Sequence, residues 1–287
     1  MDLIGQLVLG ALNGLVWGLI LALIALGLTL VFGLLEIINV SHGELYMLGG
    51  VLGWYLLQWV GNFWVALVVA PAVVGVVGLA IERGVLRPIE AKPIITIIAT
   101  FGLSLIFQQA VLSVFGGAPQ RVPAPVDWEL RIMGFGYSGY RFLVALLSLL
   151  AIVGLWAFLR HSRYGLWMRA VRQDREMALA VGIPISRVYM LTFGLGAALA
   201  ALGGVLAAPI VALEFRMGLD ILPAVFIVVI IGGLGSLGGS LLAALLIGEL
   251  EGIASVFVTP TTARIFSLVF MSMMLLFRPE GLMGRRR

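Results

Sequence analysis

Apolar residues form long runs along this chain of 287 residues, and short polar segments separate them. A helix of about 20 apolar residues crosses the hydrocarbon core of a bilayer. Several runs approach or exceed that length without any Asp, Glu, Lys, Arg or His. The pattern therefore predicts an all-α fold, a polytopic bundle of membrane helices. Four such runs are residues 64–81, 93–115, 142–159 and 188–213.

The hydropathy along the chain predicts about eight or nine membrane segments in a single domain, residues 1–287. The seventh segment is too short for a full span and ends in a cluster of glycines. Broken or short helices are therefore expected near residues 35–44 and 232–240, the first of them partly at membrane depth. The predicted segments are residues 9–34, 45–60, 63–82, 93–115, 141–159, 188–212, 221–233, 240–257 and 264–278.

Lys and Arg are concentrated in every second connection between these segments. Alternation places residues 83–92, 160–187 and 278–287 on one side of the membrane, and these connections hold most of the 18 basic residues. Cytoplasmic loops carry such an excess, so this side is expected to be cytoplasmic. The N-terminus is then outside, the C-terminus is inside, and residues 116–140 form an extracytoplasmic loop. The basic residues concerned are Arg83, Arg87, Lys92, Arg160, Arg163, Arg169, Arg172, Arg175, Arg187, Arg278, Arg285, Arg286 and Arg287.

The composition excludes several other classes of protein. Hydrophobic residues make up 62% of the chain and charged residues only 11%, whereas about 25% of the residues in a soluble domain are charged. The basic residues are spread over loops between apolar segments, so the net charge of +4 indicates orientation rather than nucleic acid binding. Cysteine is absent and only two histidines occur, so we expect neither a metal site nor a cofactor.

The polar residues after the first apolar segment form the first candidate site, as part of a substrate pathway. Acidic side chains among apolar residues are costly, and many are functional. A helix starting near Gly43 can offer free backbone N–H groups to a carboxylate, while Glu44 or Glu36 faces an ammonium group. Alternatively, Ser41 and Glu44 form a capping box and only start the helix. The candidates are Asn39, Ser41, His42, Gly43 and Glu44.

A cluster of glycines in the later half of the chain forms the second candidate site. Gly233, Gly235 and Gly238 formally match the dinucleotide-binding fingerprint. That fingerprint requires a soluble strand–turn–helix unit, and both flanks here are membrane segments. We interpret the cluster as a second helix break that adds Gly235 and Ser236 to the pathway. The alternative is a glycine-rich helix crossing that binds nothing.

The basic segment of residues 160–187 is the third candidate. Polar residues recur on one face of residues 169–176 and apolar residues on another, and Gly182 and Pro184 provide a stop. This pattern predicts a short amphipathic helix at the cytoplasmic face. Such a helix either lies on the membrane surface or docks a soluble partner.

Four runs of sequence, in order and with consistent spacing, resemble a known family. They are similar to the permease subunits of branched-chain amino acid ABC importers, and closest to the shorter of the two permeases. The resemblance covers essentially the whole chain. The runs are ALGLTLVFGLLEIINVSHGELYMLGG (25–50), RHSRYGLWMRAVRQDREMALAVGIPISRVYMLTFGLGAALAALGGVL (160–206), VVIIGGLGSLGGSLLAALLIGELE (228–251) and RPEGLMG (278–284).

The resemblance implies roles for two of the candidate segments. The helix expected in residues 160–187 resembles the EAA-type loop that sits in a groove of the ATPase, although Met177 replaces the usual second alanine. The break at residues 35–44 resembles the region near the substrate path of this family. Coupling to the ATPase is accordingly expected at Arg172, Glu176, Ala178 and Gly182.

The resemblance also implies a function and partners. The chain is expected to translocate branched-chain or other hydrophobic amino acids across the prokaryotic cytoplasmic membrane by ATP-driven alternating access. It is expected to be a transport subunit and no enzyme, and consistently it contains no P-loop. The implied partners are a second permease subunit, two cytoplasmic ATP-binding subunits and an extracytoplasmic substrate-binding protein.

Two alternatives remain open from the sequence. A sibling ABC permease for urea or short amides shares the same motifs. An ion-coupled secondary transporter would bind protons or cations at Glu36, Glu44, Glu249 and Glu251, but it has no use for the docking segment. A membrane-embedded enzyme is disfavoured because the chain has no His-Glu-x-x-His motif and no aspartate within the apolar segments.

Overall fold

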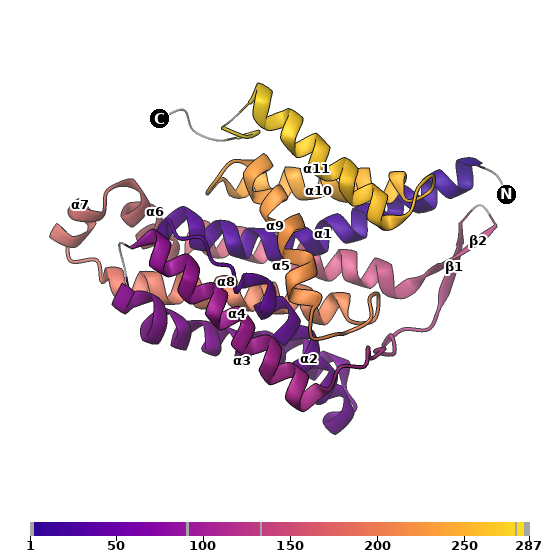
Figure 1. The fold of residues 1–287 in the computed structure, drawn as a ribbon, viewed down its shortest axis with the longest axis horizontal. Coiled ribbons are helices and arrows are strands. Elements are labelled where there is room, and N and C mark those ends of the chain that lie inside the picture. Colours follow the sequence, from indigo (N-terminus) through magenta and orange to yellow (C-terminus); the bar gives the residue numbers. More distant parts are fainter. Residues whose placement is uncertain (1–2, 90–91, 133, 279, 284–287) are drawn as a thin grey trace.

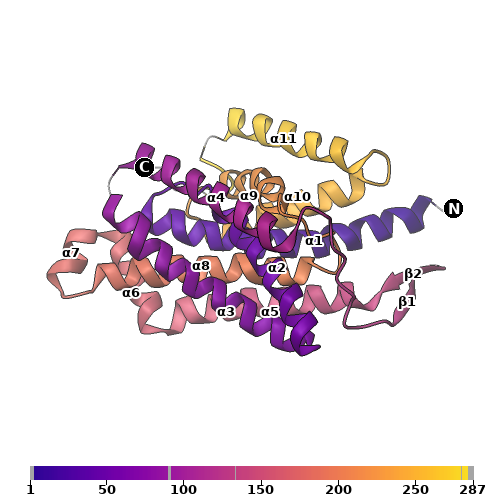
Figure 2. The same ribbon diagram turned by 60° about the horizontal axis from the view of Figure 1, so that its bottom comes forward.

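The computed structural model describes residues 3–89, 92–132, 134–278 and 280–283. In this part of the chain nine long helices pack into one bundle, with two short helices at one end and a β-hairpin at the other (Figure 1; Figure 2). The helices are α1 (Leu3–Leu35), α2 (His42–Val60), α3 (Phe63–Ile81), α4 (Pro93–Phe115), α5 (Gly139–His161), α6 (Arg163–Gln173), α7 (Arg175–Ala180), α8 (Ile185–Ala207), α9 (Met217–Gly232), α10 (Leu237–Ala254) and α11 (Pro260–Phe277). A π-helical turn η1 (Glu82–Leu86) and a 3-10 turn η2 (Arg87–Ile89) follow α3.

Each predicted apolar segment coincides with one helix, α1 to α5 and then α8 to α11. Among the described residues, 6 helices are long and apolar enough to cross a membrane, namely α1, α3, α4, α5, α8 and α10, while α9 and α11 are shorter and apolar. The prediction of a polytopic helical membrane protein is therefore confirmed. The total of eight or nine membrane segments and the sides of the two termini stay predictions.

Helix α1 runs through the middle of the bundle because glycines on its surface let other helices approach closely. Gly10 and Gly14 face α10, and a Cβ atom on Gly14 would lie 2.6 Å from the carbonyl oxygen of Gly248. On the side facing α8, a Cβ atom on Gly196 would lie 2.7 Å from the carbonyl oxygen of Gly27. Small residues at such spacing let membrane helices pack backbone against backbone.

The two ends of the bundle differ. At one end, the ring of Phe135 in the hairpin covers Gly5 near the start of α1. At the other end, Arg87 donates a hydrogen bond of 2.6 Å to Ser186, beside α6 and α7 (Figure 1). The chain after α11 returns to this second end, where residues 282–283 donate backbone hydrogen bonds to the end of α9.

A β-hairpin precedes α5, so the prediction of an all-α chain is wrong in this segment. Strand β1 (Glu129–Ile132) pairs antiparallel with β2 (Phe135–Ser138), and Leu130 lies opposite Tyr137. Gly134 in the turn has φ +84°, which glycine adopts without steric cost. A hydropathy window sized for a membrane helix averages over strands of 4 residues and their alternating pattern.

The two predicted helix interruptions are present. Helix α1 ends at Leu35 and α2 begins at His42, while α9 ends at Gly232 and α10 begins at Leu237. Helix α9 is also short at its other end, because it begins only at Met217.

Candidate functional site

The residues that connect α1 and α2 lie deep within the bundle. After α1 ends, the chain folds back along this helix until Nε2 of His42 lies 2.9 Å from the carbonyl oxygen of Ile24. Ile24 is five residues, or about 7.5 Å, from the midpoint of α1. The start of α2 therefore lies near the middle of the bundle along α1. Asn39, Ser41, His42 and Glu44 are each no more than 1% exposed.

Local hydrogen bonds shape the turn into α2. Glu36, with φ +54°, directly follows the last residue of α1. The backbone N–H and the hydroxyl of Ser41 both donate to Oδ1 of Asn39, at 3.1 and 2.7 Å, an arrangement by which asparagine stabilises turns. The hydroxyl of Thr100 in α4 accepts a hydrogen bond of 3.2 Å from the N–H of Val40. Irregular backbone inside a membrane protein requires such internal partners.

Glu44 points from the first turn of α2 towards α4. Its Oε1 accepts hydrogen bonds from the hydroxyl of Ser104 and the amide of Gln108, both at 2.9 Å. The capping-box interpretation is therefore wrong, because Ser41 occupies the N-cap position without a side-chain cap bond. A carboxylate away from water is better stabilised by two side-chain donors than by one backbone N–H.

Three buried polar atoms of this turn have no hydrogen-bond partner among the described residues. They are Nδ2 of Asn39, Nδ1 of His42 and Oε2 of Glu44. The last of these faces the start of α9, where a Cβ atom on Gly218 would collide with it. Buried polar groups are nearly always hydrogen-bonded, so each of these atoms is a candidate contact for a water molecule or a polar solute.

The sequence predicts free backbone N–H groups at the start of α2 near Gly43, but in this structure α9 packs directly against this position. A Cβ atom on Gly43 would collide with the carbonyl oxygen of Gly218, so α2 and α9 begin directly against each other. The backbone N–H groups of Glu44 and Leu45 both donate to the carbonyl oxygen of Ser41. The free oxygen of Glu44 thus remains as the acceptor at this helix junction.

Helix α4 contributes a polar stripe that the hydropathy pattern did not reveal. Thr96, Thr100, Ser104 and Gln108 are its buried polar residues, and their spacing of four residues places them on one helix face. Two of them bond Glu44 and one bonds the turn before α2. The four-residue spacing of these polar side chains is visible in the sequence. Averaging the hydropathy over this uncharged run hides it.

Gly235 and Ser236 lie apart from this turn. The hydroxyl of Ser236 accepts a hydrogen bond of 3.2 Å from the N–H of Gly239 and so caps α10. Gly235, with φ +78°, lies beside Gly33 of α1. Gly33 is nine residues, or about 14 Å, from Ile24 along the helix. The structure therefore does not bring the two breaks together into one site.

The segment of residues 160–187 contains two short helices. Helix α6 ends at Gln173, and Asp174 caps α7 by accepting a hydrogen bond of 2.9 Å from the N–H of Met177. The prediction of one amphipathic helix is therefore wrong, because an aspartate in the N-cap position favours a new helix start. The predicted stop is present, since Gly182 has φ +82° just beyond α7.

Helix α7 projects from the end of the bundle (Figure 1), and several apolar side chains in and just after it are exposed. Met177, Leu179 and Val181 are 61%, 57% and 69% exposed, whereas Ala178 is 3% exposed. Glu176 is exposed beside them. Three large apolar side chains exposed within residues 177–181 of a projecting element indicate a site that binds another protein.

Arg172 connects α6 with the second break. A Cβ atom on Gly235 would lie 3.2 Å from Nη2 of Arg172. Met168 and Val171 of α6 are buried in a small apolar cluster that also contains Val188 of α8. A displacement of α6 would therefore act on α8 and on the loop between α9 and α10.

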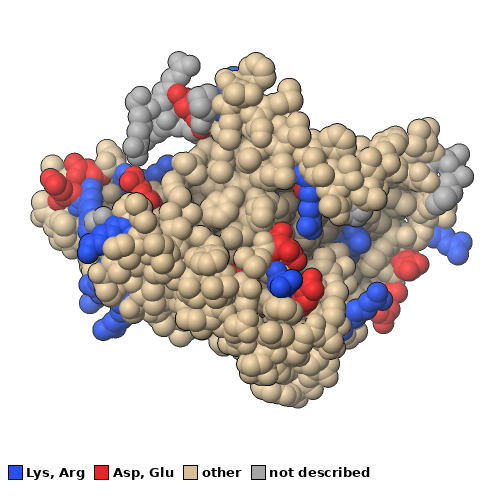
Figure 3. All heavy atoms as spheres, viewed as in Figure 1, with Lys and Arg blue, Asp and Glu red and all other residues tan. Residues whose placement is uncertain are grey.

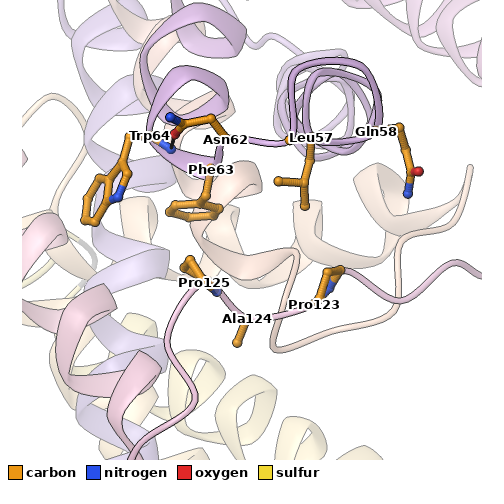
Figure 4. A pocket seen from close by; sticks show the side chains of 9 residues that line it. Leu57, Gln58, Asn62, Phe63, Trp64, Pro123, Ala124 and Pro125 are labelled. Carbon is orange, nitrogen blue, oxygen red and sulfur yellow. Dashed lines mark hydrogen bonds between the residues drawn. The ribbon is translucent and has the colours of Figure 1, made fainter.

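A cavity of about 520 Å³ opens beside the turn between α2 and α3. Figure 4 shows side chains of this turn on one side and Pro123, Ala124 and Pro125 on the other. Leu57 is thirteen residues, or about 20 Å, from Glu44 along α2, so the cavity is separate from the buried turn. Its lining is Leu57, Gln58, Gly61, Asn62, Phe63, Trp64, Pro123, Ala124 and Pro125.

These features define a class of protein, a multi-pass membrane protein with a buried polar turn among its helices and a projecting element at one end. The chain belongs to the family described as branched-chain amino acid transport system / permease component, which matches residues 10–278. It is accordingly a multi-pass protein of the prokaryotic cytoplasmic membrane.

Individual relatives are similar over nearly the whole chain. The high-affinity branched-chain amino acid transport system permease protein LivH of Escherichia coli (strain K12) is 30% identical, with 95% of this chain and 94% of the relative covered. The corresponding permease protein BraD of Pseudomonas aeruginosa is 31% identical with the same coverage. A probable LivH permease of Methanocaldococcus jannaschii is 28% identical, with 95% and 91% covered. No solved structure matches the chain.

Proposed function

We propose that this chain is the membrane-spanning subunit of an ABC importer and moves branched-chain or other hydrophobic amino acids into the cell by ATP-driven alternating access. The family covers nearly the whole chain. The observation that carries the mechanism is the projection of α7, whose exposed apolar residues lie outside the apolar helices. A secondary transporter has no use for such a docking element.

The end of the bundle that bears α6 and α7 is the cytoplasmic end in this proposal. Residues 83–89, 160–187, 278 and 280–283 meet there, and together they are rich in arginine. An excess of basic residues marks the cytoplasmic side. The hairpin and the start of α1 then lie outside. The arginines at 285–287, which also entered the prediction, lie outside the described residues.

Coupling runs through α6 and α7. In the proposal an ATP-binding subunit binds the element that contains Glu176, Ala178 and Gly182. Arg172 transmits the displacement of this element to the break at Gly235. The support is the contact of Arg172 with that glycine loop and the burial of Ala178 beneath the exposed face. The chain itself hydrolyses no ATP, so separate subunits supply that reaction.

The substrate pathway passes the buried turn before α2. Its support is the set of unpaired polar atoms on Asn39, His42 and Glu44 and the polar stripe of α4, which bonds Glu44 and the backbone of Val40. Polar groups that face inward between membrane helices mark solute paths. Gly235 and Ser236 lie at the cytoplasmic end of that path and act as a hinge next to the coupling segment.

The complete importer contains two permeases, two ATP-binding subunits and an extracytoplasmic substrate-binding protein. The binding protein sets most of the selectivity between leucine, isoleucine and valine. Relatives named as permease proteins of branched-chain amino acid transport systems support this assembly.

The test is ATP-dependent uptake of labelled leucine in liposomes that contain this chain with its second permease, ATPases and binding protein. Glu176→Arg reverses a charge on the proposed docking face and is expected to abolish uptake without lowering the yield of folded chain. Glu129→Arg is the matched control, because it makes the same change in the hairpin at the opposite end.

Three outcomes separate the hypotheses. Uptake that requires ATP and binding protein, and that Glu176→Arg but not Glu129→Arg removes, supports the proposal. Uptake driven by a proton or sodium gradient without ATP contradicts it and favours the ion-coupled alternative. ATP-dependent uptake of urea but not leucine retains the mechanism and replaces the substrate.

A further inference from the structure

The start of α9 carries two charged residues on its outer surface. Arg216 and Asp220 are both exposed, and their spacing of four residues places them on the same face of the helix. In Figure 3 most charged residues lie towards the two ends of the molecule, and only a few lie in the middle of the side that is drawn. Charges of both signs in such a place require an explanation.

The start of α9 lies at the same depth as the buried turn. Gly218 of α9 contacts Gly43 of α2, and the adjacent His42 bonds Ile24, which is about 7.5 Å from the midpoint of α1. The hydrocarbon core extends about 15 Å to each side of the bilayer centre. Exposed charges at this depth cannot face lipid at low cost, so they face a water-filled cavity or another subunit.

Neither charge is neutralised within the described part of the chain. The guanidinium of Arg216 lies 5.5 Å from the ring centre of Phe215, and no ion pair or side-chain hydrogen bond is formed by Arg216 or Asp220 among the described residues. A structural pair that only stabilised the helix would bring the two charged groups into contact. These two groups are instead available to a ligand.

A second, independent observation points to the same place. Glu44 is 1% exposed, and its Oε2 is unpaired and faces Gly218. Helix α9 begins without a side-chain cap, although the N–H of Met217 donates to the carbonyl oxygen of Glu214.

We propose that this face of α9, defined as Arg216, Leu219 and Asp220 with Glu44 behind it, binds the zwitterionic end of an amino acid during translocation. Arg216 pairs with the α-carboxylate, assisted by the positive end of the helix dipole. Asp220 pairs with the α-ammonium group, while Glu44 lies behind the helix, against Gly218. Side chains four residues apart on a helix have Cβ atoms about 5–6 Å apart, a separation suited to the two neighbouring charges of an amino acid.

This inference rests on the proposed function and makes it specific, because it assigns recognition to charges that every α-amino acid shares. The apolar side chain of the solute would contact other surfaces. The permease would then distinguish amino acids from amides and carboxylic acids, and the binding protein would distinguish one amino acid from another.

Thiol labelling tests the proposal without relying on transport. The chain contains no cysteine, so a single introduced thiol is the only target in this subunit. Leu219→Cys places it between the two charges, and Ile106→Cys places it on the opposite face of α4 from Ser104, where it is expected to face lipid. In the complete importer, a charged methanethiosulfonate reagent should label residue 219 at least roughly tenfold faster than residue 106, because the thiolate forms only in water.

The zwitterion is tested by protection of the same thiol. Leucine should slow the labelling of Leu219→Cys more than leucinamide, which lacks the carboxylate, or 4-methylpentanoate, which lacks the ammonium group. Adding Arg216→Gln should remove the advantage of leucine over leucinamide, and adding Asp220→Asn should remove its advantage over 4-methylpentanoate. Adding Glu129→Gln in the distant hairpin should leave protection intact.

Two results would overturn the inference. The first is a thiol at residue 219 as unreactive as that at residue 106, which would make this face a dry contact with the second permease. The second is equal protection by all three compounds, which would show that this site does not recognise the zwitterionic end of an amino acid. Either result combined with normal ATP-dependent leucine uptake would leave the proposed function standing, whereas loss of that uptake in the unaltered importer would contradict the proposed function itself.

Discussion

The two helix breaks of this protein look alike in the hydropathy pattern and differ in nearly every physical respect. The break before α2 is polar and buried, and its Glu44 bonds Ser104 and Gln108 of a distant helix. The break before α10 is made of glycines, with φ +95° at Gly233 and +78° at Gly235. The break before α2 has unpaired polar atoms near the middle of α1. The break before α10 contacts Arg172 of α6 near the C-terminal end of α1.

The difference teaches that an interrupted apolar segment has at least two uses. A polar interruption supplies side chains that meet a solute, and its own backbone must be satisfied by neighbouring helices. A glycine interruption supplies a bend of the backbone that few other residues adopt. Four substitutions, in order of decreasing expected effect, test whether the two breaks differ in this way.

Gly43→Val should have the largest effect on stability. Its side chain would collide with the backbone of Gly218, which cannot move aside without shifting α9. We expect a loss of about 3 kcal/mol in the free energy of unfolding, the upper range for overpacking. Chemical unfolding in detergent measures it. Gly102→Val is the control, because a Cβ atom there meets nothing within 4 Å; equal losses for both variants would contradict the close contact of α2 and α9.

Glu44→Leu should cost about 2 kcal/mol, because it leaves two buried donors without an acceptor. Glu44→Gln keeps an acceptor oxygen and should cost less than half as much. A double-mutant cycle of Glu44→Leu with Gln108→Leu isolates the bond to α4, with an expected coupling of about 1 kcal/mol. Absence of any coupling would mean that α4 is not held by this network.

Gly235→Ala should cost about 1.5 kcal/mol, because an L-residue is strained in the left-handed region. The added methyl group also approaches Arg172 at 3.2 Å, so leucine uptake should fall more than stability does. Gly238→Ala is the control, since its φ is not positive and its new contact, with Met283, lies at 3.5 Å. Indistinguishable uptake in the two variants would separate this break from coupling.

Ser236→Ala should have the smallest effect, about 1 kcal/mol, from loss of the cap of α10. Ser236→Gly should cost only a few tenths of a kcal/mol, because glycine is itself an acceptable N-cap residue. Thermal unfolding in detergent compares the two. A loss as large as that for Glu44→Leu would show that the second break also depends on a polar network.

Many features of the candidate site could be predicted from the sequence, but their connections could not. Asn39 to Glu44 stood out because polar residues among apolar ones are rare, and Gly182 stood out as a helix stop. Ser104, Gln108 and Gly218 were not identified, since each contacts Glu44 across a separation of at least 60 residues. The capping box failed for the same reason, because local spacing offered Glu44 one partner and the fold supplied two better ones.

The sequence by itself determined that this is a membrane protein, where its helices lie and to which family it belongs. A bilayer requires each crossing segment of such a bundle to be apolar and helical, so each membrane helix can be recognised from its own stretch of sequence. Only the tertiary structure decided that the two breaks lie about 14 Å apart along α1, that α2 and α9 begin against each other at Gly43 and Gly218, and that Arg216 and Asp220 share an exposed face at that depth. These relations depend on which helices pack together, and packing in a membrane follows the fit of small and polar residues across helices rather than hydropathy.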